Sequence, residues 1–300
     1  MNLTKSKNIN FLILVILTML CSIQISAQQK VKVLTKTIHK EIEYKGQGLE
    51  VIGEKSTITL IGNESNLIKI EIKLISKNIS ESDARKDLNI IKYDIKELRS
   101  ADILSNHFES DEYKDITSNL SVVYNIYVPY KCQVNLTNIY GNIYVSQLNS
   151  SLNVKSSFGE MKMENITGKI DLDLKYVNLN ADKINTKMIC IADKTDMYFK
   201  ETTGNIDIRA NYGEINIDSP SKENNINIDA ARTEVSLVLP EYMEYNYRLI
   251  TKSSDIFVPK ELKGSNKTDK QLKTFNLQKA DKINQIKIST TYSPITIKSF

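Results

Sequence analysis

The sequence predicts an all-β protein: a single-stranded β-solenoid, or β-helix, with about 18 residues per coil, preceded by a β-rich N-terminal part with one short helix. An apolar-x-apolar unit recurs every nine residues through the middle of the chain, and a second period of 18 residues lies over the first. Hydrophobic residues make up 41% of the 300 residues, which is enough for a packed core, while 10 glycines and 5 prolines argue against long flexible linkers.

Residues 1–27 are predicted to be a secretory signal peptide. Lys5 and Lys7 form its positive start, residues 11–20 form a fully apolar stretch apart from one threonine, and Ala27 supplies a small side chain for cleavage. This stretch is half as long as the roughly 20 residues that a membrane-spanning helix needs, and no second one follows. We therefore expect an exported protein of the periplasm or outer cell surface, without a transmembrane span after cleavage.

The three cysteines raise two questions of processing. Cys21 would allow lipoprotein modification, but Leu20 occupies the position where lipidation favours a small residue. Cys132 and Cys190 remain in the mature chain, and the repeat places them three coils, or about 14 Å, apart. Because a disulfide joins Cα atoms within about 7 Å, the sequence predicts two free buried thiols.

The segment 28–129 is predicted to be β-rich and to form one continuous domain with the repeats that follow. Apolar and polar residues alternate over 68–75, as in a half-buried strand. Apolar residues at three- and four-residue spacing predict a short helix near 81–91. Residues 99–119 are mostly polar, so we expect a loop there before a strand over 122–128.

The β-solenoid repeats are predicted to occupy residues 130–300. In each unit an apolar pair flanks a polar residue, and in most units a glycine or another small residue precedes the pair. Glycine there suits a tight corner with a positive φ. The first member of successive pairs is Ile143, Leu152, Met161, Ile170, Leu179, Met188, Met197, Ile206 and Ile215. An antiparallel meander would leave this apolar face uncovered, whereas a solenoid buries its two half-turns against each other, and we favour the solenoid.

The C-terminal third departs from the strict period. After Ile217 the register slips by two residues, and the pattern resumes at Ile226. Residues 260–273 are rich in lysine and poor in apolar residues, so we expect a surface loop. Residues 292–295 repeat the pattern of residues 140–143, except that a proline occupies an outward strand position. Because proline belongs on edge strands, we expect residues 292–295 to form the terminal coil.

Three kinds of motif resemble those of a known family. They are the recurring aromatic-glycine-x-aliphatic units, two predicted strands near the start of the mature chain, and an Ile-Tyr-Val-Pro segment. These motifs lie at 140–143, 158–161, 212–215, 49–53, 58–62 and 126–129. They resemble a family of exported bacterial proteins described as candidate adhesins, including the head-GIN type of Bacteroidetes. The resemblance covers residues from about 45 to 300. It implies a β-solenoid with an adhesin-like role in the cell envelope or at the cell surface, and it brings no catalytic residues to this chain.

The sequence contains no motif for nucleophilic catalysis, phosphate binding or zinc-protease chemistry, and we expect no catalytic, cofactor-binding or metal-binding residues. His39 and His107 lie in separate segments without neighbouring cysteines. The net charge is +4, and it falls to +2 when the two lysines of the leader are removed. So small an excess does not favour nucleic acid as a partner.

The 18-residue period aligns outward polar residues into two rows. The first row comprises Asn142, Glu160, Asn178, Asp196 and Glu214, whose carboxylates and amides could bind cations or sugars. The second row comprises Tyr144, Lys162, Asn180, Tyr198 and Asn216, and its two tyrosines could contact a sugar or a protein. A solvated strand face would carry the same rows, so both interpretations stay open. A third series, Tyr140, Phe158, Tyr176 and Tyr212 with Lys194 in its gap, is expected to pack at a corner of the coil.

Three functions fit these observations. The favoured one is a non-enzymatic exported scaffold that binds glycan, matrix or another envelope protein. The second is a role in envelope maintenance or stress response without adhesion. The third is a carbohydrate-active β-helix enzyme, for which Asp171 and Asp207 lie two coils apart, although no basic residue is evidently aimed at them.

Overall fold

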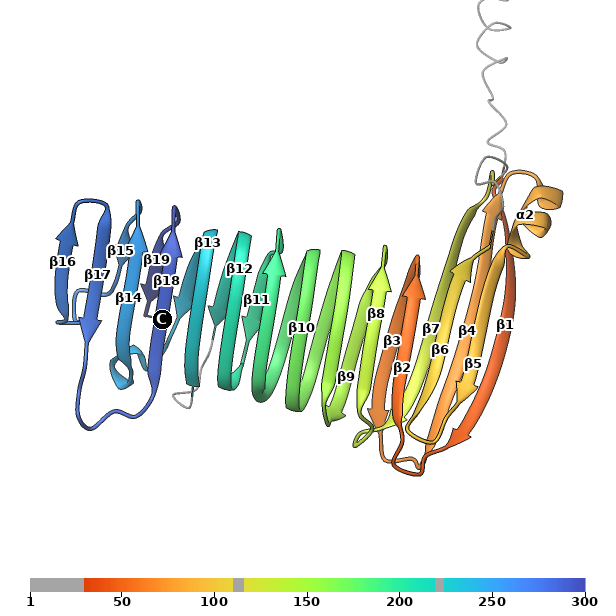
Figure 1. Cartoon of the computed structure of the whole chain (residues 1–300), viewed down its shortest axis with the longest axis horizontal. Coiled ribbons are helices and arrows are strands. Elements are labelled where there is room, and N and C mark those ends of the chain that lie inside the picture. The colour runs from red at the N-terminus through yellow and green to blue at the C-terminus, as the bar shows by residue number, and fades with distance from the viewer. Residues whose placement is uncertain (1–29, 110–115, 219–223, 300) are drawn as a thin grey trace, which may run out of the picture.

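The computed structural model describes residues 30–109, 116–218 and 224–299. They form nineteen β-strands, one α-helix and one 3₁₀ helix, and the strands wind into a single elongated stack of coils (Figure 1). The all-β solenoid class predicted from the sequence is confirmed. The predicted signal peptide lies outside the described residues.

The middle of the stack contains the sequence repeats. Its strands are β8 (Val134–Ile139), β9 (Ile143–Asn149), β10 (Leu152–Asp193), β11 (Met197–Lys200), β12 (Thr203–Asp218) and β13 (Asn224–Val238). Residues eighteen positions apart pair in parallel: Leu152 with Val134, Met161 with Ile143, and Ile206 with Met188. The offset becomes twenty between β12 and β13, where Ile226 pairs with Ile206, so the predicted slip of two residues is also confirmed.

The interior of the coils is apolar because alternate strand residues point inward. All nine members of the Ile143-to-Ile215 series are at most 2% exposed. Complete burial of one such side chain contributes about 1.5–3 kcal/mol, so this interior is the main stabilising element of the stack. Cys132 and Cys190 are buried and free, which confirms the prediction of two unbridged thiols.

Each coil turns at residues with a positive φ. At the first bend these residues are Lys55, Tyr140, Phe158, Tyr176, Lys194, Tyr212, Arg232 and Tyr292, with φ between 48° and 64°. At the second bend they are Gln147, Asn165, Lys183 and Glu201, with φ between 48° and 57°. Left-handed backbone is unfavourable for residues with a Cβ, so both bends hold strained positions.

Glycine follows several first-bend residues for a reason other than the predicted positive φ. At Gly141 and Gly159 that expectation is wrong, because the aromatic residue before each glycine takes the left-handed conformation instead. A Cβ at Gly159 would collide with the backbone oxygen of Gly141 on the neighbouring coil. The glycine therefore permits close approach of two backbones.

The N-terminal part continues the same stack. Its strands are β1 (Lys32–Glu43), β2 (Gly48–Glu54), β3 (Ser56–Asn63), β4 (Leu67–Asn78), β5 (Ile91–Glu97), β6 (Ala101–Phe108) and β7 (Asn119–Pro129). Strands β2 and β3 pair in parallel with β8 and β9 on one side and with β6 and β7 on the other. Strands β5 and β4 then add antiparallel to β6 and β7, and β1 covers β4.

Two sequence expectations are tested in this part. The short helix is confirmed as α2 (Glu81–Leu88), whose first turn is capped by the Ser80 hydroxyl accepting from the Asp83 N–H. The loop expected over 99–119 is wrong over Ala101–Phe108, which forms β6. Two of its four inward residues, Asp102 and Asn106, are polar and buried, so the strand lacks the apolar alternation that would reveal it.

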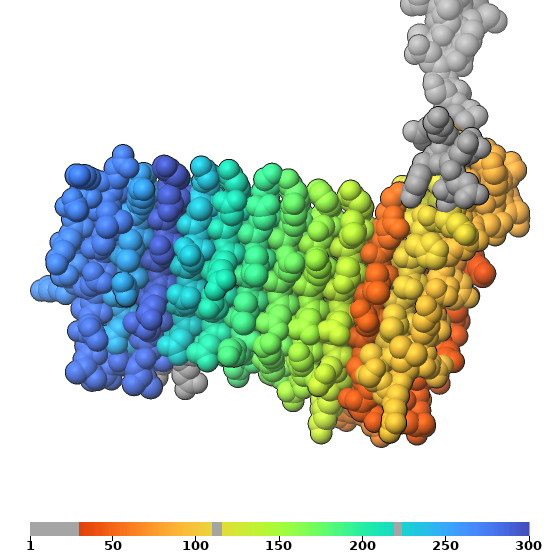
Figure 2. Space-filling view, viewed as in Figure 1, coloured from red at the N-terminus to blue at the C-terminus, as the bar shows by residue number. Residues whose placement is uncertain are grey.

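The C-terminal part is interleaved. Its strands are β14 (Asn246–Lys252), β15 (Ile256–Phe257), β16 (Ser265–Asp269), β17 (Leu272–Leu277), β18 (Gln285–Thr291) and β19 (Ile295–Lys298). The last two strands pair with β13 on one side and with β14 and β15 on the other. Figure 2 shows this as a dark blue layer between the cyan coil and the paler blue end of the rod.

Two expectations for this part are therefore wrong. The coil of residues 292–295 is not terminal, because it lies inside the stack rather than at its end. The loop expected over 260–273 contains β16 and the start of β17, a hairpin that adds to β14 and covers the end of the stack. Every residue of β16 is exposed, so the strand needs no apolar face and none appears in the sequence.

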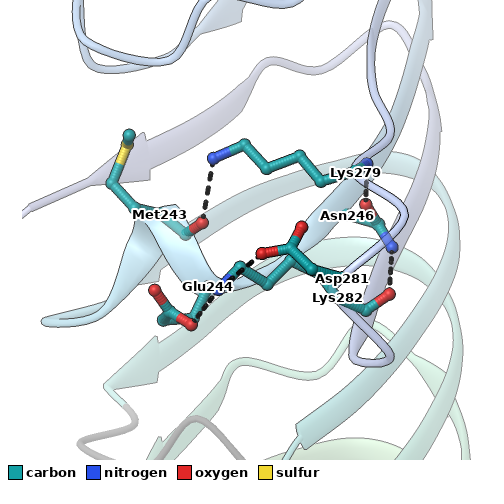
Figure 3. Close-up of polar contacts among 6 residues, drawn as sticks. All are labelled: Met243, Glu244, Asn246, Lys279, Asp281 and Lys282. Carbon is teal, nitrogen blue, oxygen red and sulfur yellow. Dashed lines mark hydrogen bonds and ion pairs between the residues drawn. The ribbon is translucent and has the colours of Figure 1, made fainter.

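The connection that carries the chain back into the stack is fixed by side chains. It lies against the 3₁₀ helix η2 (Tyr242–Glu244), as Figure 3 shows. The Asn246 amide donates to the Lys282 carbonyl (2.8 Å) and accepts from the Lys279 N–H (2.7 Å). The Lys282 ammonium is 2.5 Å from the Glu244 carboxylate, and this hydrogen bond raises the lysine pKa above its usual value.

Candidate binding surfaces

The first polar row lies on one outward side of the coils, which we call the stripe face. It is defined by the two rows that contain Asn142 and Tyr144. The structure brings Asn142 beside Glu160, because the Asn142 Oδ1 accepts the Glu160 N–H at 3.0 Å. The Asp196 Oδ1 likewise accepts the Glu214 N–H at 3.0 Å. Asn142 and Asp196 therefore help to join coils, while the side chains of Glu160 and Glu214 remain exposed.

The row is longer than the sequence period indicates. Glu234 pairs with Glu214 across β12 and β13, and Asp255 lies at the same outward position beyond Pro294. Sequence reasoning missed both because the two-residue slip and the interleaved last coil break the 18-residue count. Lys273 forms an ion pair with Asp255. Within the described ranges, Glu214 and Glu234 form no ion pair, so this part of the stripe face is acidic.

The second row places its tyrosines next to the first. The Asn142 amide donates to the Tyr144 hydroxyl at 3.2 Å, and the Lys162 ammonium lies 5.8 Å from the centre of the Tyr144 ring. Tyr198 stands outward and is 42% exposed. Hydroxyl, amide and carboxylate groups thus alternate over a short distance, which suits hydrogen bonding to a ligand with many hydroxyl groups.

The N-terminal strands extend the second row. Thr59 pairs with Tyr144, Asn125 with Thr59, Glu71 with Asn125, and His39 with Glu71. Hydrogen bonds from Lys73 and then from Asn125 lower the pKa of the Glu71 carboxyl. The stripe face therefore runs from the first strand of the described chain into the repeats.

The first bend forms an exposed ladder that we call the aromatic corner, comprising Tyr140, Phe158, Tyr176, Lys194, Tyr212, Arg232 and Tyr292. The Phe158 ring stacks on Tyr140 and on Tyr176, with centroids 4.9 Å apart in both cases. The Lys194 ammonium lies 4.7 Å above the Tyr176 ring, and the Arg232 guanidinium lies 5.3 Å from Tyr212 and from Tyr292. Packing at the corner was the sequence expectation, and these contacts are of that kind.

The second bend shows that the backbone does not require aromatic residues. It uses the same left-handed conformation at Gln147, Asn165, Lys183 and Glu201 without a single ring. The five rings of the aromatic corner are 39–57% exposed, and each has a ring or a cation of the neighbouring coil against at least one face. The corner therefore joins coils through its ring faces and offers ring edges to solvent, interrupted by Lys194 and Arg232.

The buried ionisable groups are not arranged for chemistry. Burial raises the pKa of both the Cys132 and Cys190 thiols to about 12, so neither is a ready nucleophile at neutral pH. Burial also raises the pKa of Asp102, which accepts a hydrogen bond from Gln47 at 2.9 Å. Among the described residues, no group of three or more histidine, cysteine or acidic side chains could hold a metal ion.

Asp171 and Asp207, the pair considered for carbohydrate chemistry, are separated by an intervening coil. Ile189 pairs with Asp207 and stands between the two carboxylates. Asp171 is neutralised by Lys169 at 2.6 Å. In the part of the chain that the structure covers, no helix is long and apolar enough to cross a membrane.

Comparison with known families gives a match over residues 24–298. The chain belongs to the Toastrack DUF4097 family. The solved structures similar to this Toastrack chain include candidate adhesins.

Three of those structures show how distant the likeness is. A candidate cell adhesion protein from Clostridium sporogenes is 14% identical, covers 89% of this chain and 100% of its own, and has a TM-score of 0.29. A candidate adhesin from Bacteroides fragilis is 13% identical, with coverage of 88% and 97% and a TM-score of 0.39. One from Parabacteroides distasonis is 9% identical, with coverage of 88% and 97% and a TM-score of 0.38. No curated protein matches the Toastrack chain.

Proposed function

We propose that this Toastrack protein is a non-enzymatic, exported scaffold of the periplasm or outer cell surface that binds a glycan, the matrix or another envelope protein. The observation that carries the proposal is the continuity of the stripe face. The same outward position recurs on each coil at about 4.8 Å, so a ligand lying along the rod meets a regular series of groups.

The residues proposed to bind are Asn142, Glu160, Asn178, Asp196, Glu214, Tyr144 and Tyr198. Glu234 supplies acceptors that are not used within the described chain, and one oxygen of Glu214 remains beside the one that accepts from the Asn216 amide at 3.4 Å. Tyr198 supplies an exposed ring beside them. Carboxylates accept hydrogen bonds from hydroxyl groups, and exposed tyrosines are enriched where proteins meet partners. The adjacent aromatic corner widens this surface with ring edges.

A non-enzymatic role is supported by the chemistry of the groups that could react. Both thiols are buried, and each has a pKa far above neutrality. Asp171 and Asp207 face solvent on different coils with a hydrophobic side chain between them. Paired carboxylate catalysis needs two acids that share one bond of the substrate, with separate pKa values.

A glycan array followed by analysis of the eluted sugars tests binding and cleavage together. The mature chain should bind at least one glycan class and release no shorter product. The double variant Glu214→Gln, Tyr198→Ala should bind at least about tenfold more weakly, because it removes one acceptor and one contact ring. Asn153→Ala, on the other side of the coil, is the matched control and should bind as the unchanged protein does.

Export is tested by mass spectrometry and by labelling of intact cells. The mature protein should begin at Gln28, and a diacylglyceryl-modified Cys21 would instead establish a lipoprotein. An amine-reactive label that does not enter cells should modify the protein if it lies on the outer surface. Failure to bind any glycan, matrix protein or envelope protein would contradict the scaffold proposal and leave envelope maintenance as the better account.

A further inference from the structure

The half-turns opposite the stripe face form a long depression, which we call the groove face. Its central outward residues are Asn153, Asp171, Ile189, Asp207, Asn227, Lys287 and Arg248. Two hollows of about 540 and 340 Å³ merge in its C-terminal half, because Asn227 and Lys287 line both. A third hollow of about 450 Å³ continues past Arg248. The region is therefore one groove, and the fixed connection of Figure 3 lies near its end.

Among the described residues, the basic side chains are ion-paired in the N-terminal half of this groove but not in the C-terminal half. In the N-terminal half, the Lys169 ammonium is 2.6 Å from the Asp171 carboxylate, and Lys155 is 4.0 Å from Asp173. Each lysine there has an acidic partner one strand away or on the same strand. Acidic side chains of the chain itself therefore neutralise both lysines in this half of the groove.

The C-terminal half leaves its cations unpaired. They are Lys187, Arg209, Lys287 and Arg248. Within residues 30–109, 116–218 and 224–299, these four form no ion pair and no side-chain hydrogen bond. Lys287 lies directly opposite Arg248 on adjacent strands, where like charges destabilise each other. Asp229 lies opposite Arg209 on the adjacent strand, and Asp207 supplies a second negative charge nearby, so two of the four positive charges have no counter-charge in the part of the chain that the structure describes.

Amides and aliphatic groups complete the lining. The Asn225 amide donates to Asn205 at 3.0 Å and its oxygen accepts the Gln285 N–H at 3.0 Å, which holds a row of three amides in register. Ile189 and Ile191 point outward at the other end and are 39% and 52% exposed. Amides hydrogen-bond hydroxyl groups, and aliphatic surface packs against the C–H faces of sugar rings.

We propose that the C-terminal half of the groove face binds an acidic polysaccharide, a hydroxyl-rich chain that carries carboxylate groups. The carboxylates meet Lys287, Arg248 and Arg209, and the hydroxyls meet the amide row. Charge-assisted hydrogen bonds to arginine and lysine are the strong contacts of such a site. The proposal rests on the proposed scaffold function and adds to it a second ligand, bound at a face other than the stripe face.

The interleaved last coil sets the order of the residues along this site. Lys287 belongs to β18, which lies between Asn227 of β13 and Arg248 of β14. If the coils stacked in sequence order, Arg248 would lie beside Asn227, and Lys287 would lie one strand further along the groove. The interleaved order therefore places Gln285 and Lys287 beside Asn225 and Asn227, which the order of the strands along the sequence does not indicate.

The test measures binding of the mature full-length chain to polygalacturonate, with highly methyl-esterified polygalacturonate as the uncharged match. The free acid should bind at least about tenfold more tightly than the ester, and its binding should weaken as salt is raised. The variant Lys287→Gln, Arg248→Gln should lose at least about tenfold in affinity. The control Lys155→Gln, Lys169→Gln, on the paired half of the same face, should change affinity by less than about twofold.

The outcomes separate this inference from the scaffold function. Thermal melts of both double variants establish that they fold, and single variants replace a pair that does not. Equal binding of acid and ester, or unchanged binding by the Lys287, Arg248 variant, overturns the acidic-polysaccharide site. Equally tight binding of double-stranded DNA also overturns it, because simple charge attraction would then suffice. If other glycans bind while polygalacturonate does not, only this inference fails; if no partner binds, both proposals fail.

Discussion

Phe158 is the residue of the aromatic corner at which ring stacking and backbone strain can be separated. Its ring lies 4.9 Å from the Tyr140 ring and 4.9 Å from the Tyr176 ring, with interplanar angles of 15° and 7°. Each aromatic pair contributes about 0.5–1.5 kcal/mol, so Phe158→Ala should destabilise the protein by about 1–3 kcal/mol. The φ of 60° opposes this gain, since a left-handed residue with a Cβ costs about 1–2 kcal/mol.

Glycine at position 158 removes both the ring stacking and the cost of the left-handed backbone. Phe158→Gly should therefore be about 1 kcal/mol more stable than Phe158→Ala, although still less stable than the unchanged protein. Asn165→Gly at the second bend is the matched control, because Asn165 has φ 53° and no ring neighbour, and it should shift stability by no more than about 0.5 kcal/mol.

Urea-induced unfolding followed by far-ultraviolet circular dichroism measures these differences. Three proteins are compared with the unchanged chain under one buffer condition, so that the midpoint shifts are directly comparable. If Phe158→Gly is as stable as the unchanged protein, ring stacking does not hold the coils together. The aromatic corner would then have to be explained by its exposed edge alone.

Three further predictions concern the interior and its titrating groups. Ile170 is 0% exposed, so Ile170→Asp should reduce the free energy of unfolding by several kcal/mol. Asp171→Asn should reduce it by less than about 1 kcal/mol, because the Asp171–Lys169 ion pair is at the surface. Equal losses in urea melts would mean that the register is wrong. Cys132 and Cys190 should resist a maleimide in the native state and react fully after denaturation without reductant, and a disulfide found by mass spectrometry would contradict this. Burial raises the pKa of Asp102, so the folded state binds the Asp102 proton more tightly than the unfolded state does. The contribution of Asp102 to stability is therefore greatest at low pH and is lost as the pH rises through the folded-state pKa. Asp102→Asn should flatten this fall in stability in melts from pH 4 to 7, and an unchanged slope would contradict the prediction.

The repeating part of the fold could be predicted because each coil repeats the same alternation. Apolar pairs nine residues apart define inward and outward positions wherever one face is buried. That pattern places Asn142, Glu160 and Glu214 in one row, as the structure shows. It also predicts that Cys132 and Cys190 are free and buried, as they are.

The rest could not be predicted, because it depends on which coils are neighbours rather than on local pattern. Strand β6 hides its period behind buried Asp102 and Asn106, and β16 has no buried face at all. Glu234 joins the acidic row only across the two-residue slip. Lys287 lies between Asn227 and Arg248 only because β18 enters the stack between β13 and β14.

The interleaved order of the last coils assembles the groove face, and two pairs of introduced cysteines test it directly. Ser236 pairs with Thr296, and Thr296 pairs in turn with Phe257, so Ser236 and Phe257 lie two strands apart. Adjacent strands are about 4.8 Å apart, within the reach of a disulfide, whereas two strand spacings exceed the limit of about 7 Å. Stacking in sequence order would instead make Ser236 and Phe257 neighbours.

The measurement is the extent of disulfide formation after mild oxidation of the folded protein, read by mass spectrometry. The structure predicts that Ser236→Cys, Thr296→Cys forms a bridge nearly completely, while Ser236→Cys, Phe257→Cys stays reduced. The buried thiols of Cys132 and Cys190 do not interfere. A bridge in the second pair and none in the first would contradict the interleaved stack and the groove built on it.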